Sequence, residues 1–500
     1  EGAALNLGEA MTPITLNYTV NANASSGSGS SSSSGTSSST SFAYANNKIY
    51  AGNGHTCAIL DGGDVKCWGM DSYGQLGDGG ATHNTYTYLT APPSSPINLG
   101  TGRTAVAVAM GGNNACAVLD NGDLKCWGSG SLGKLGLGTN YNVYAPSSTP
   151  IDLGQGRTAV AVSTMVSTCA ILDNGDLKCW GPDQFGQLGD GGTTHNSGTH
   201  TTQPSSTPVD LGQGRTAVAV SVGGSHVCAI LDNGDLKCWG SDSDGQLGDG
   251  GATHNSYTMI TQPPSTPVDL GQGRTAVAVS AGNMHTCAIL DNGDLKCWGK
   301  DNYGQLGDGG TSHDSNTKTT QPSSTPVDLG QGRTAVAVST WGDFTCAILD
   351  NGDLKCWGHD SWGQLGDGGA DTDIYAPSST PVDLGVGRTA VAVSAGAKHT
   401  CAILDNGDAK CWGYGVYGRL GNGGTTDQSS PVSVSGSNTW DTTTTVTTWE
   451  THPALPAGMS ISAGTISGTP SVYALNQTYT IYANQSGYST THELYFSVDT

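Results

Sequence analysis

The sequence predicts an all-β protein that combines a seven-bladed β-propeller with a smaller β-sandwich. The first observation is that the 14 cysteines of this 500-residue chain form seven pairs with nine residues between partners, recurring every 53 to 59 residues. A fixed period of this kind indicates repeated supersecondary units. The second observation is that each unit holds short β-rich segments separated by Gly, Asn, Asp and Pro, with no competing helical period. About four strands per unit, repeated seven times, is typical of a seven-bladed propeller.

One complete unit shows the expected order of elements. The segment Pro267–Leu270 is followed by a Gly-Gln-Gly-Arg loop and by the strand Thr275–Val279. A hairpin then turns at Asp-Asn-Gly, and centring that turn on Asn292 places Cys287 opposite Cys297. A three-residue loop whose glycine adopts the left-handed conformation fits this spacing.

The cysteine pairs are predicted to form disulfides, because directly opposed residues at a non-hydrogen-bonded strand position lie close enough to bridge. One bridge per blade is expected: Cys57–Cys67, Cys116–Cys126, Cys169–Cys179, Cys228–Cys238, Cys287–Cys297, Cys346–Cys356 and Cys401–Cys411. Zinc is the alternative, but structural zinc sites usually have about two to four residues between cysteines, and they need four ligands per metal. Three of the seven units also lack a nearby histidine. Disulfides are favoured, and they predict an extracellular or cell-surface location.

The short Gly-containing loop after each Pro-x-x-Leu segment predicts that this segment pairs with the strand that follows it, within one blade. The first unit has no such segment before Asn47, whereas the last unit ends with an unpaired one at residues 431–434. We therefore expect residues 431–434 to complete the first blade and to leave no open sheet edge. This closure would bring residues 42 and 435 close together.

The repeat resembles that of the regulator-of-chromosome-condensation family. The resemblance is carried by Val279–Leu290 and by Gly304-Gln-Leu-Gly307, recurs seven times and covers about residues 42–435. It implies the propeller fold. Eukaryotic members of the family catalyse nucleotide exchange on a nuclear GTPase, but that activity is not carried over. Seven disulfides do not suit a nucleus, and the chain has no long wedge-like insertion.

The two ends of the chain differ from the propeller in composition, because residues 1–47 and 420–500 contain no lysine or arginine. The C-terminal segment resembles the immunoglobulin-like repeats of microbial surface proteins through Leu455–Gly458 and Gly464–Pro470. About sixty residues are too few for a sandwich, which usually takes near 100. Strand-like residues near the N-terminus supply the missing part, so the propeller is predicted to be inserted in a split immunoglobulin-like domain. The expected boundaries are 1–23 (N-terminal strands), 24–41 (Ser/Gly linker), 42–435 (propeller) and 436–500 (the rest of the sandwich).

The N-terminal strand that carries Ile14, Leu16, Tyr18 and Val20 has two alternative positions. It can complete the sandwich of its own chain, which effective concentration favours. The flexible linker also permits it to complete the sandwich of a neighbouring chain, and head-to-tail exchange of this kind would produce a fibre. The residues leave both alternatives open.

Two sets of histidines recur. The first set, His55, His226, His285 and His399, occupies one repeat position, and a structural role is favoured there. The second set, His83, His195, His254 and His313, lies in loops that are longer in four of the units. Repeat insertions often line a binding face, so these are candidate binding loops, although an ordinary solvated loop is the favoured interpretation.

Other repeated residues fit structural roles. The acidic Asp-Asn-Gly loops lack the spaced ligands and closing glutamate of a calcium-binding EF-hand, and turn chemistry explains them. The Cys-Trp-Gly tryptophans and the periodic arginines are predicted to pack the blades, with Arg–Trp stacking. No catalytic constellation, metal site or cofactor motif is apparent, so an enzyme is not expected. Four glycosylation candidates lie outside the propeller: Asn17, Asn23, Asn476 and Asn484.

These features predict a structural protein of the cell surface or of an extracellular filament, assembled non-covalently through N-terminal strand exchange. The alternative is a secreted or surface binding module whose propeller face recognises a glycan or a protein, without polymerisation. With 19 basic and 41 acidic side chains, the net charge of −22 argues against a nucleic-acid partner. No apolar run reaches the roughly 18–20 residues that a membrane span needs.

Overall fold

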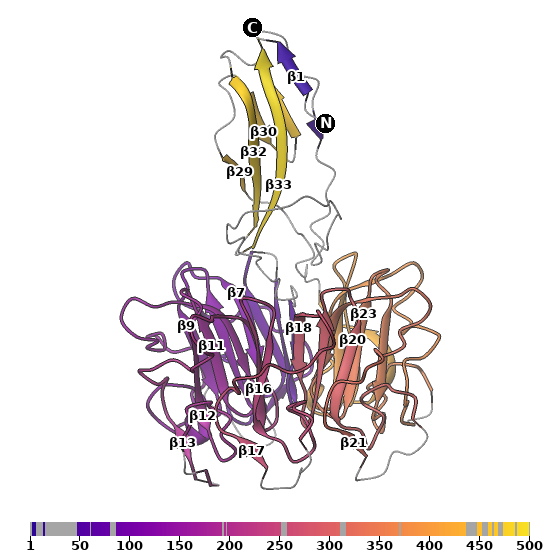
Figure 1. Cartoon of the computed structure of the whole chain (residues 1–500). Helices are drawn as coiled ribbons and strands as arrows, with labels where there is room; N and C mark the ends of the chain where they lie inside the picture. Colours follow the sequence, from indigo (N-terminus) through magenta and orange to yellow (C-terminus); the bar gives the residue numbers. More distant parts are fainter. Residues whose placement is uncertain are drawn as a thin grey trace. The chain divides into compact units, whose positions relative to one another are not determined.

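The structure is a computed structural model, and the chain forms two compact units (Figure 1). One unit comprises residues 34–442 and the other comprises residues 1–33 with 443–500. In the first unit the structure describes residues 48–436 except 61, 81–86, 193–194, 197, 252–257, 311–316 and 370–371. In the second unit it describes the backbone of seven strands. Among the described residues, no helix has the length and apolar character needed to cross a bilayer.

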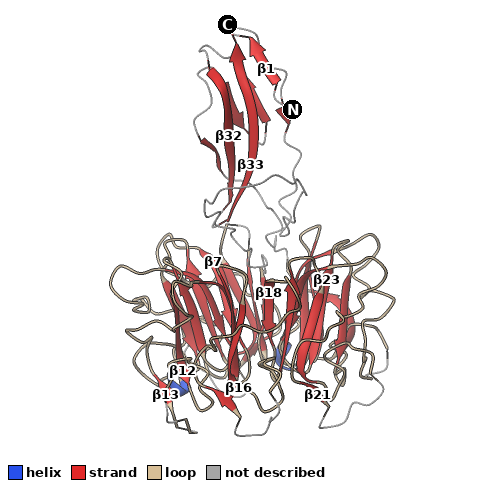
Figure 2. Ribbon diagram, in the orientation of Figure 1, coloured by secondary structure: helices blue, strands red, loops and turns tan. Residues whose placement is uncertain are grey.

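The larger unit is a seven-bladed propeller in which each blade is a separate antiparallel sheet (Figure 2). Blade one contains β3 (Ile49–Ala51), β4 (His55–Ile59), β5 (Val65–Met70) and β6 (Tyr88–Leu89). Blade two contains β7 (Ala105–Met110), β8 (Asn114–Leu119) and β9 (Leu124–Gly128). Blade three contains β10 (Ala159–Thr164), β11 (Thr168–Leu172), β12 (Leu177–Pro182) and β13 (His200–Thr201). Blades four and five contain β14 (Ala217–Val222), β15 (His226–Leu231), β16 (Leu236–Ser241) and β17 (Met259–Ile260); and β18 (Ala276–Ala281), β19 (His285–Leu290), β20 (Leu295–Lys300) and β21 (Lys318–Thr319). Blades six and seven contain β22 (Ala335–Thr340), β23 (Phe344–Leu349) and β24 (Leu354–Gly358); and β25 (Ala390–Ala395), β26 (His399–Leu404), β27 (Ala409–Gly413) and β28 (Gln428–Ser433). Two short 3-10 helices, η1 (Ser131–Gly133) and η2 (Val416–Gly418), follow β9 and β27.

The central hairpin of each blade has the register that the cysteine spacing predicts. In blade five, Cys287 faces Cys297 and Ile289 faces Leu295. The turn glycine, Gly293, has φ +83°, which is the left-handed conformation that glycine tolerates best. All seven predicted disulfides are present, with Cα–Cα separations of 4.0–4.1 Å.

The prediction that each Pro-x-x-Leu segment pairs with the strand after it is wrong. Val268 N–H donates to the carbonyl of Leu236, in the preceding blade, over 2.8 Å. The carbonyl of Leu270 accepts from Lys296 Nζ of the following blade at 2.9 Å. The segment therefore lies between two blades. The four-residue loop after it connects blades rather than two strands of one hairpin.

The predicted closure through residues 431–434 is wrong for the same reason. Val432 pairs with Cys411, so this segment belongs to β28 at the outer edge of blade seven. The ring instead closes by packing blade seven against blade one. Ala51 N–H donates to Ser394 Oγ at 2.9 Å, and Thr56 Oγ1 lies 2.9 Å from His399 Nε2. Residue 42, expected near residue 435, lies outside the described residues.

A fully buried tryptophan connects each blade to its neighbour. In every case the indole N–H donates to a main-chain carbonyl of the preceding blade over 2.9–3.1 Å: Trp68 to Arg419, Trp127 to Gln75, Trp180 to Lys134, Trp239 to Gln187, Trp298 to Gln246, Trp357 to Gln305 and Trp412 to Gln364. The predicted stacking of the periodic arginines on these rings is wrong. Each arginine instead pairs with an aspartate of the hairpin turn, as Arg274 does with Asp291 at 3.4 Å.

The smaller unit contains two sheets, ordered β1-β33-β32-β29 and β2-β31-β30. Its strands are β1 (Ala3–Asn6), β2 (Ile14–Thr15), β29 (Thr448–His452), β30 (Met459–Ser462), β31 (Thr465–Gly468), β32 (Ala474–Gln485) and β33 (Tyr488–Asp499). β1 pairs in parallel with β33, and β2 pairs antiparallel with β31. Both N-terminal strands are therefore edge strands.

Several predicted features of the ends fall outside the described residues. They are the linker 24–41, the strand positions Leu16, Tyr18 and Val20, and the glycosylation candidates Asn17 and Asn23. Asn476 and Asn484 lie on β32, of which only the backbone is described.

The close approach of glycine to each tryptophan gives a stability prediction. A Cβ on Gly307 would lie 2.5 Å from Trp357 Nε1, whereas a Cβ on Gly332 would meet nothing within 4 Å. Their φ angles are similar, +72° and +70°. Gly332→Ala should therefore cost only the left-handed strain, about 1 kcal/mol, and Gly307→Ala about 1–3 kcal/mol more from the clash.

The measurement is the guanidinium midpoint of each full-length variant. Equal losses for the two variants would contradict the proposed steric role of Gly307.

Candidate functional site

The two ends of each blade carry different kinds of segment. Successive strands are antiparallel, so the turn between the first and second strands and the loop between the third and fourth lie at one end. We call this end of the propeller the loop face. The Asp-Asn-Gly hairpin turns lie at the opposite end. The candidate binding loops predicted from the histidines belong to the loop face.

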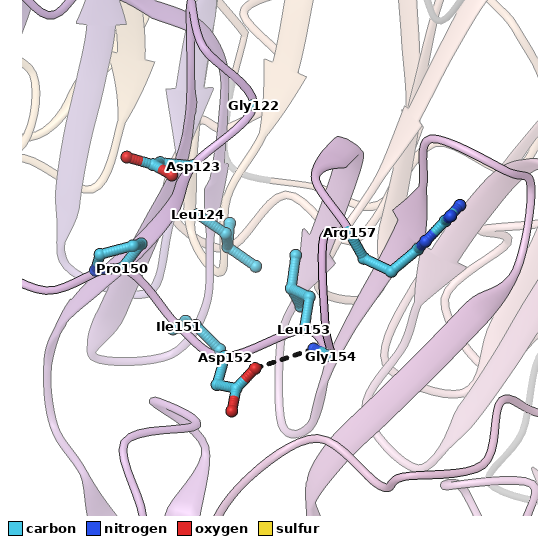
Figure 3. Close-up of a pocket in the computed structure, with 9 residues that line it drawn as sticks. All are labelled: Gly122, Asp123, Leu124, Pro150, Ile151, Asp152, Leu153, Gly154 and Arg157. Carbon is cyan, nitrogen blue, oxygen red and sulfur yellow. Dashed lines mark hydrogen bonds between the residues drawn. The ribbon is translucent and has the colours of Figure 1, made fainter.

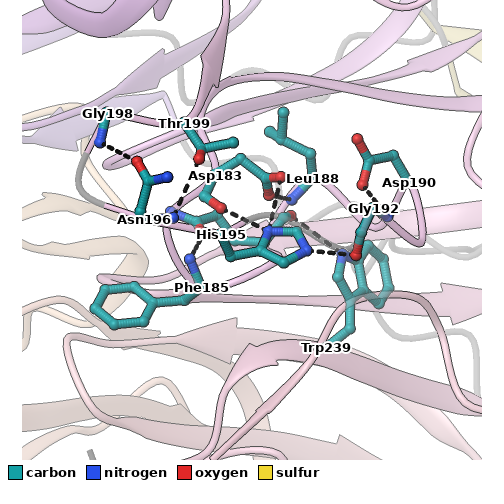
Figure 4. Close-up of polar contacts among 11 residues, drawn as sticks. Asp183, Phe185, Leu188, Asp190, Gly192, His195, Asn196, Gly198, Thr199 and Trp239 are labelled. Atoms are coloured by element: carbon teal, nitrogen blue, oxygen red, sulfur yellow. Dashed lines mark hydrogen bonds and ion pairs between the residues drawn. The ribbon is translucent and has the colours of Figure 1, made fainter. Parts of the chain in front are cut away.

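Of the four loop histidines, His195 is the one that the structure describes (Figure 4). His83, His254 and His313 lie outside the described residues. His195 Nδ1 lies 2.9 Å from the carbonyl oxygen of Asp183 and 3.1 Å from its Oδ2. His195 Nε2 lies 2.6 Å from the carbonyl oxygen of Gly192. The longer loop is thus folded back onto its own blade by one imidazole.

Both ring nitrogens of His195 face oxygen acceptors, which requires an N–H on each and therefore the imidazolium form. The side chains of His195 and Asp183 are 5% and 3% exposed. Burial alone would lower the pKa of His195, but hydrogen bonds to the Asp183 and Gly192 carbonyls and the nearby carboxylates raise it overall. Burial raises the pKa of Asp183 to about 6. Asp183 Oδ1 also accepts Leu188 N–H at 2.9 Å, which fixes the start of the loop.

Asp183, Asp190 and His195 bring three donor atoms within 4.8 Å, the one such group in the described part of the chain. Both His195 nitrogens are already engaged as donors, and Asp190 Oδ1 accepts Gly192 N–H at 2.9 Å. This arrangement suits a loop held by an imidazolium better than a metal site. The spacing Asp-x6-Asp-x4-His recurs in the other three units that have long loops.

The other histidine set has a packing role. His226, His285 and His399 are fully buried, and each Nε2 lies 2.8–3.1 Å from a threonine hydroxyl of the next blade. Burial lowers the pKa of His226 and of His285 to about 3, so both rings are neutral. These residues connect blades and are not available to a ligand.

An aromatic cluster on the loop face was not predicted from the sequence. Its rings contact across three successive blade boundaries. The distance between ring centroids is 4.5 Å for Tyr303 and His359, 4.4 Å for Trp362 and Tyr414, and 6.1 Å for Tyr88 and Tyr417. We call these six residues the aromatic strip. Tyr88 is 42% exposed and the other five are half-buried.

Two cations lie against the strip. Lys398 Nζ is 4.6 Å from the centroid of the Trp362 ring and 5.4 Å from that of Tyr414. Arg419 Cζ is 4.7 Å from the Tyr414 centroid and 6.0 Å from that of Tyr417. Tyr417 has φ +65°, an unfavourable conformation for an aromatic residue, and Leu132 at the equivalent position of blade two has φ +57°. A sequence signal was available, because Tyr303, Trp362 and Tyr417 occupy one repeat position that is aromatic in five of the seven units. The contacts of these rings, however, join separate blades.

A pocket of about 290 Å³ lies at the opposite end, beside the hairpin turn of blade two (Figure 3). It is lined by Gly122, Asp123, Leu124, Pro150, Ile151, Asp152, Leu153, Gly154 and Arg157. Asp152 Oδ1 accepts Gly154 N–H at 2.9 Å, and Arg157 pairs with Asp173 at 3.1 Å. These polar groups serve turns and blade contacts, so the pocket offers no separate chemistry.

Comparison with known proteins agrees with the propeller geometry. Residues 146–452 match the model of the RCC1-like domain, and residues 47–75 and 105–134 match the regulator of chromosome condensation (RCC1) repeat. The chain belongs to the RCC1-like domain family. Residues 422–499 match a putative Ig domain, in agreement with the immunoglobulin-like resemblance of the C-terminus.

Three relatives show how far the likeness extends. Ultraviolet-B receptor UVR8 of Arabidopsis thaliana is 29% identical over 389 residues, covering 77% of this chain and 80% of that protein. RCC1 domain-containing protein RUG3, mitochondrial, of the same plant is 26% identical over 388 residues, covering 73% and 81%. The crystal structure of Prp20p from Saccharomyces cerevisiae superposes with a TM-score of 0.63 at 20% identity, covering 78% and 88%. The last comparison shows the fold alone.

The His195 contacts predict that the loop loosens as pH rises. The folded pKa of His195 is raised, so its stabilisation is complete below the unfolded value of about 6.5 and is lost as pH rises through the folded value. Asp183 acts in the same direction. Burial raises its pKa from 3.8 to about 6 in the folded protein, so ionisation of this carboxyl destabilises the loop as pH rises through that range. Amide hydrogen exchange at Leu188 and Gly192, corrected for intrinsic rates, should therefore be faster at pH 8.5 than at pH 5.5.

The matched variants are His195→Gln, which should reduce this dependence to the part that Asp183 contributes, and His200→Gln, which should retain it in full. His200 begins β13 directly after the same loop, is half-buried, and its Nδ1 lies 2.7 Å from Gly198 O. A pH dependence of unchanged size in His195→Gln would contradict the assignment.

Proposed function

We propose that this protein is a secreted or surface-displayed binding module without catalytic activity, and that its loop face recognises a glycan or a protein. The aromatic strip carries this proposal. The fold is already held by seven buried tryptophans and seven disulfides, so the partly exposed stacked rings are not needed for packing. Aromatic side chains combine apolar area with few rotatable bonds, which suits a recognition surface.

The disulfides support an extracellular location. Every cysteine of the described chain is paired and none is free. Disulfides at this density are typical of oxidising compartments and rare in the cytosol. Glycosylation at Asn17, Asn23, Asn476 and Asn484 is part of the same proposal.

Other proteins with this fold fit a binding role. Solved structures describe yeast Prp20p and its binding properties to Gsp1p and histones, and Kap60 bound to yeast RCC1 (Prp20). Those partners belong to those proteins. What we carry over is only that a protein with this fold binds other macromolecules.

A glycan array tests the proposal with the full-length protein. We expect defined glycans to bind the wild type, and the double variant Tyr303→Ala/Trp362→Ala to lose most of the signal because stacking area is removed. Tyr141→Ala is the matched control, since Tyr141 is 79% exposed and belongs to no ring pair of the strip. Absence of any bound glycan, together with no effect of the double variant on a protein ligand, would refute the module.

The second candidate is the filament subunit, for which β1 and β2 provide the specific observation. Each pairs with a single strand at a sheet edge, so another copy could supply either strand without changing any other pairing. In this proposal residues 1–23 and 436–500 form one split immunoglobulin-like domain around the linker 24–41 and the propeller 42–435. Pairing within the chain gives a monomer, and exchange gives a head-to-tail homopolymer.

A disulfide cross-link distinguishes the two arrangements. Thr15 faces Thr465 in the register of β2 and β31, so Thr15→Cys/Thr465→Cys should oxidise to a bridge between these strands. Strand exchange predicts a ladder of covalent oligomers on a non-reducing gel, and self-completion predicts a cross-linked monomer. Each single-cysteine variant is the control for non-specific dimers. A cross-linked monomer as the sole product would refute the filament.

A further inference from the structure

The repeated cations of the propeller are already engaged by the fold. Five lysines of one repeat position are buried, and each donates through Nζ to a leucine carbonyl over 2.9–3.0 Å. Six arginines of the other position pair with aspartates at 3.1–3.4 Å. These two positions account for 13 of the 19 basic residues once Lys66 and Lys410 are included. A cation outside them serves another purpose.

Five of the remaining six basic residues lie on the loop face: Lys134, Lys300, Lys318, Lys398 and Arg419. Two of these contact the aromatic strip. Lys398 is half-buried, lies over two rings, and pairs with no carboxylate in the described part of the chain. Its ammonium group is thus held at the surface by aromatic faces, with its hydrogen-bond donors available to a ligand.

Arg419 adds a second positive charge and fixes the geometry. It is 4% exposed, and it donates from Nη1 to Asn53 O at 2.7 Å and from Nε to Val416 O at 2.9 Å. Burial lowers its pKa to about 10, so it stays charged at neutral pH. Asp427, the acid that acts on Arg419, has Oδ1 occupied by Gly415 N–H at 2.8 Å. Lys398 and Arg419 thus place two positive charges near the Tyr414 ring, at 5.4 and 4.7 Å from its centroid.

We infer that the aromatic strip binds an acidic polysaccharide, with sugar rings stacked on its aromatic faces and a carboxylate or sulfate paired with Lys398. This inference rests on the proposed function and specifies its ligand class. Three ring pairs at successive blade boundaries fit a chain of repeating units better than a single small molecule. Two cations are sufficient for a polymer that carries one negative charge per sugar and contacts the protein through a few sugars. A phosphate backbone needs a track of cations.

Isothermal titration of the full-length protein with polygalacturonate, its methyl-esterified form and dextran sulfate tests the inference. We expect polygalacturonate or dextran sulfate to bind and the methyl ester to bind at least about tenfold more weakly, because a charge-assisted hydrogen bond is lost. Binding of only one of the two polyanions identifies carboxylate or sulfate as the anion. Lys398→Gln should weaken binding about tenfold. Lys318→Gln, which removes a charge on the same face but outside the strip, where Nζ donates to Ser243 O at 2.9 Å, should leave it unchanged.

Three results would overturn the inference: equal binding of the methyl ester, an unchanged affinity in Lys398→Gln, or tighter binding of poly-glutamate or of an oligothymidylate. If neutral glycans or a protein bind through the strip and polyanions do not, the proposed binding module is supported and the acidic-polysaccharide ligand is refuted. If no glycan, polyanion or protein binds at all, both the binding module and the acidic-polysaccharide ligand are refuted. Circular dichroism of Lys398→Gln, expected to match the wild type, shows that a loss of binding is not a loss of fold.

Discussion

The hydrogen bond from each buried indole to a carbonyl of the preceding blade is the interaction on which the rest of the propeller depends. It recurs at all seven boundaries, and the indole would be left with an unsatisfied buried donor without it. The accepting carbonyl belongs to the loop Gly-Gln-Leu-Gly or its variants, and the second glycine of that loop has no room for a Cβ. The same contact therefore fixes the spacing of the blades and the start of every outer loop.

Residues that recur in every unit and residues that differ between units have different roles. Residues that recur in each unit form disulfides, indole bonds, lysine–carbonyl bonds and arginine–aspartate pairs, all of which act between or within blades. Residues at positions that vary between units, such as His359, Lys398 and Tyr414, gather on the loop face. A symmetric scaffold cannot by itself discriminate one ligand from another, so specificity has to come from those departures.

The sequence predicted the hairpins and their disulfides because the register of a tight turn is a local property. A three-residue turn leaves one way for Cys287 to face Cys297. It did not predict the course of Pro267–Leu270, since a short loop does not reveal whether the next strand belongs to the same sheet or to the next blade. The bond from Val268 to Leu236 decided this, and it joins residues 32 positions apart. The aromatic strip was missed for a similar reason, because Trp362 and Tyr414 meet only once two blades pack together.

The seam between blades seven and one combines contacts that hold the ring with part of the aromatic strip. At the other six boundaries the chain continues from one blade into the next, but here only non-covalent contacts hold the ring. At this boundary Arg419 replaces the usual glutamine, and its guanidinium reaches across to Asn53 O of blade one. Tyr417 and Tyr88 meet at the same boundary. A ligand that spans the strip from Trp362 to Tyr88 would contact both sides of the seam, and binding to the closed ring alone stabilises it by mass action. The position of the strip thus couples recognition to the one junction that the chain does not close covalently.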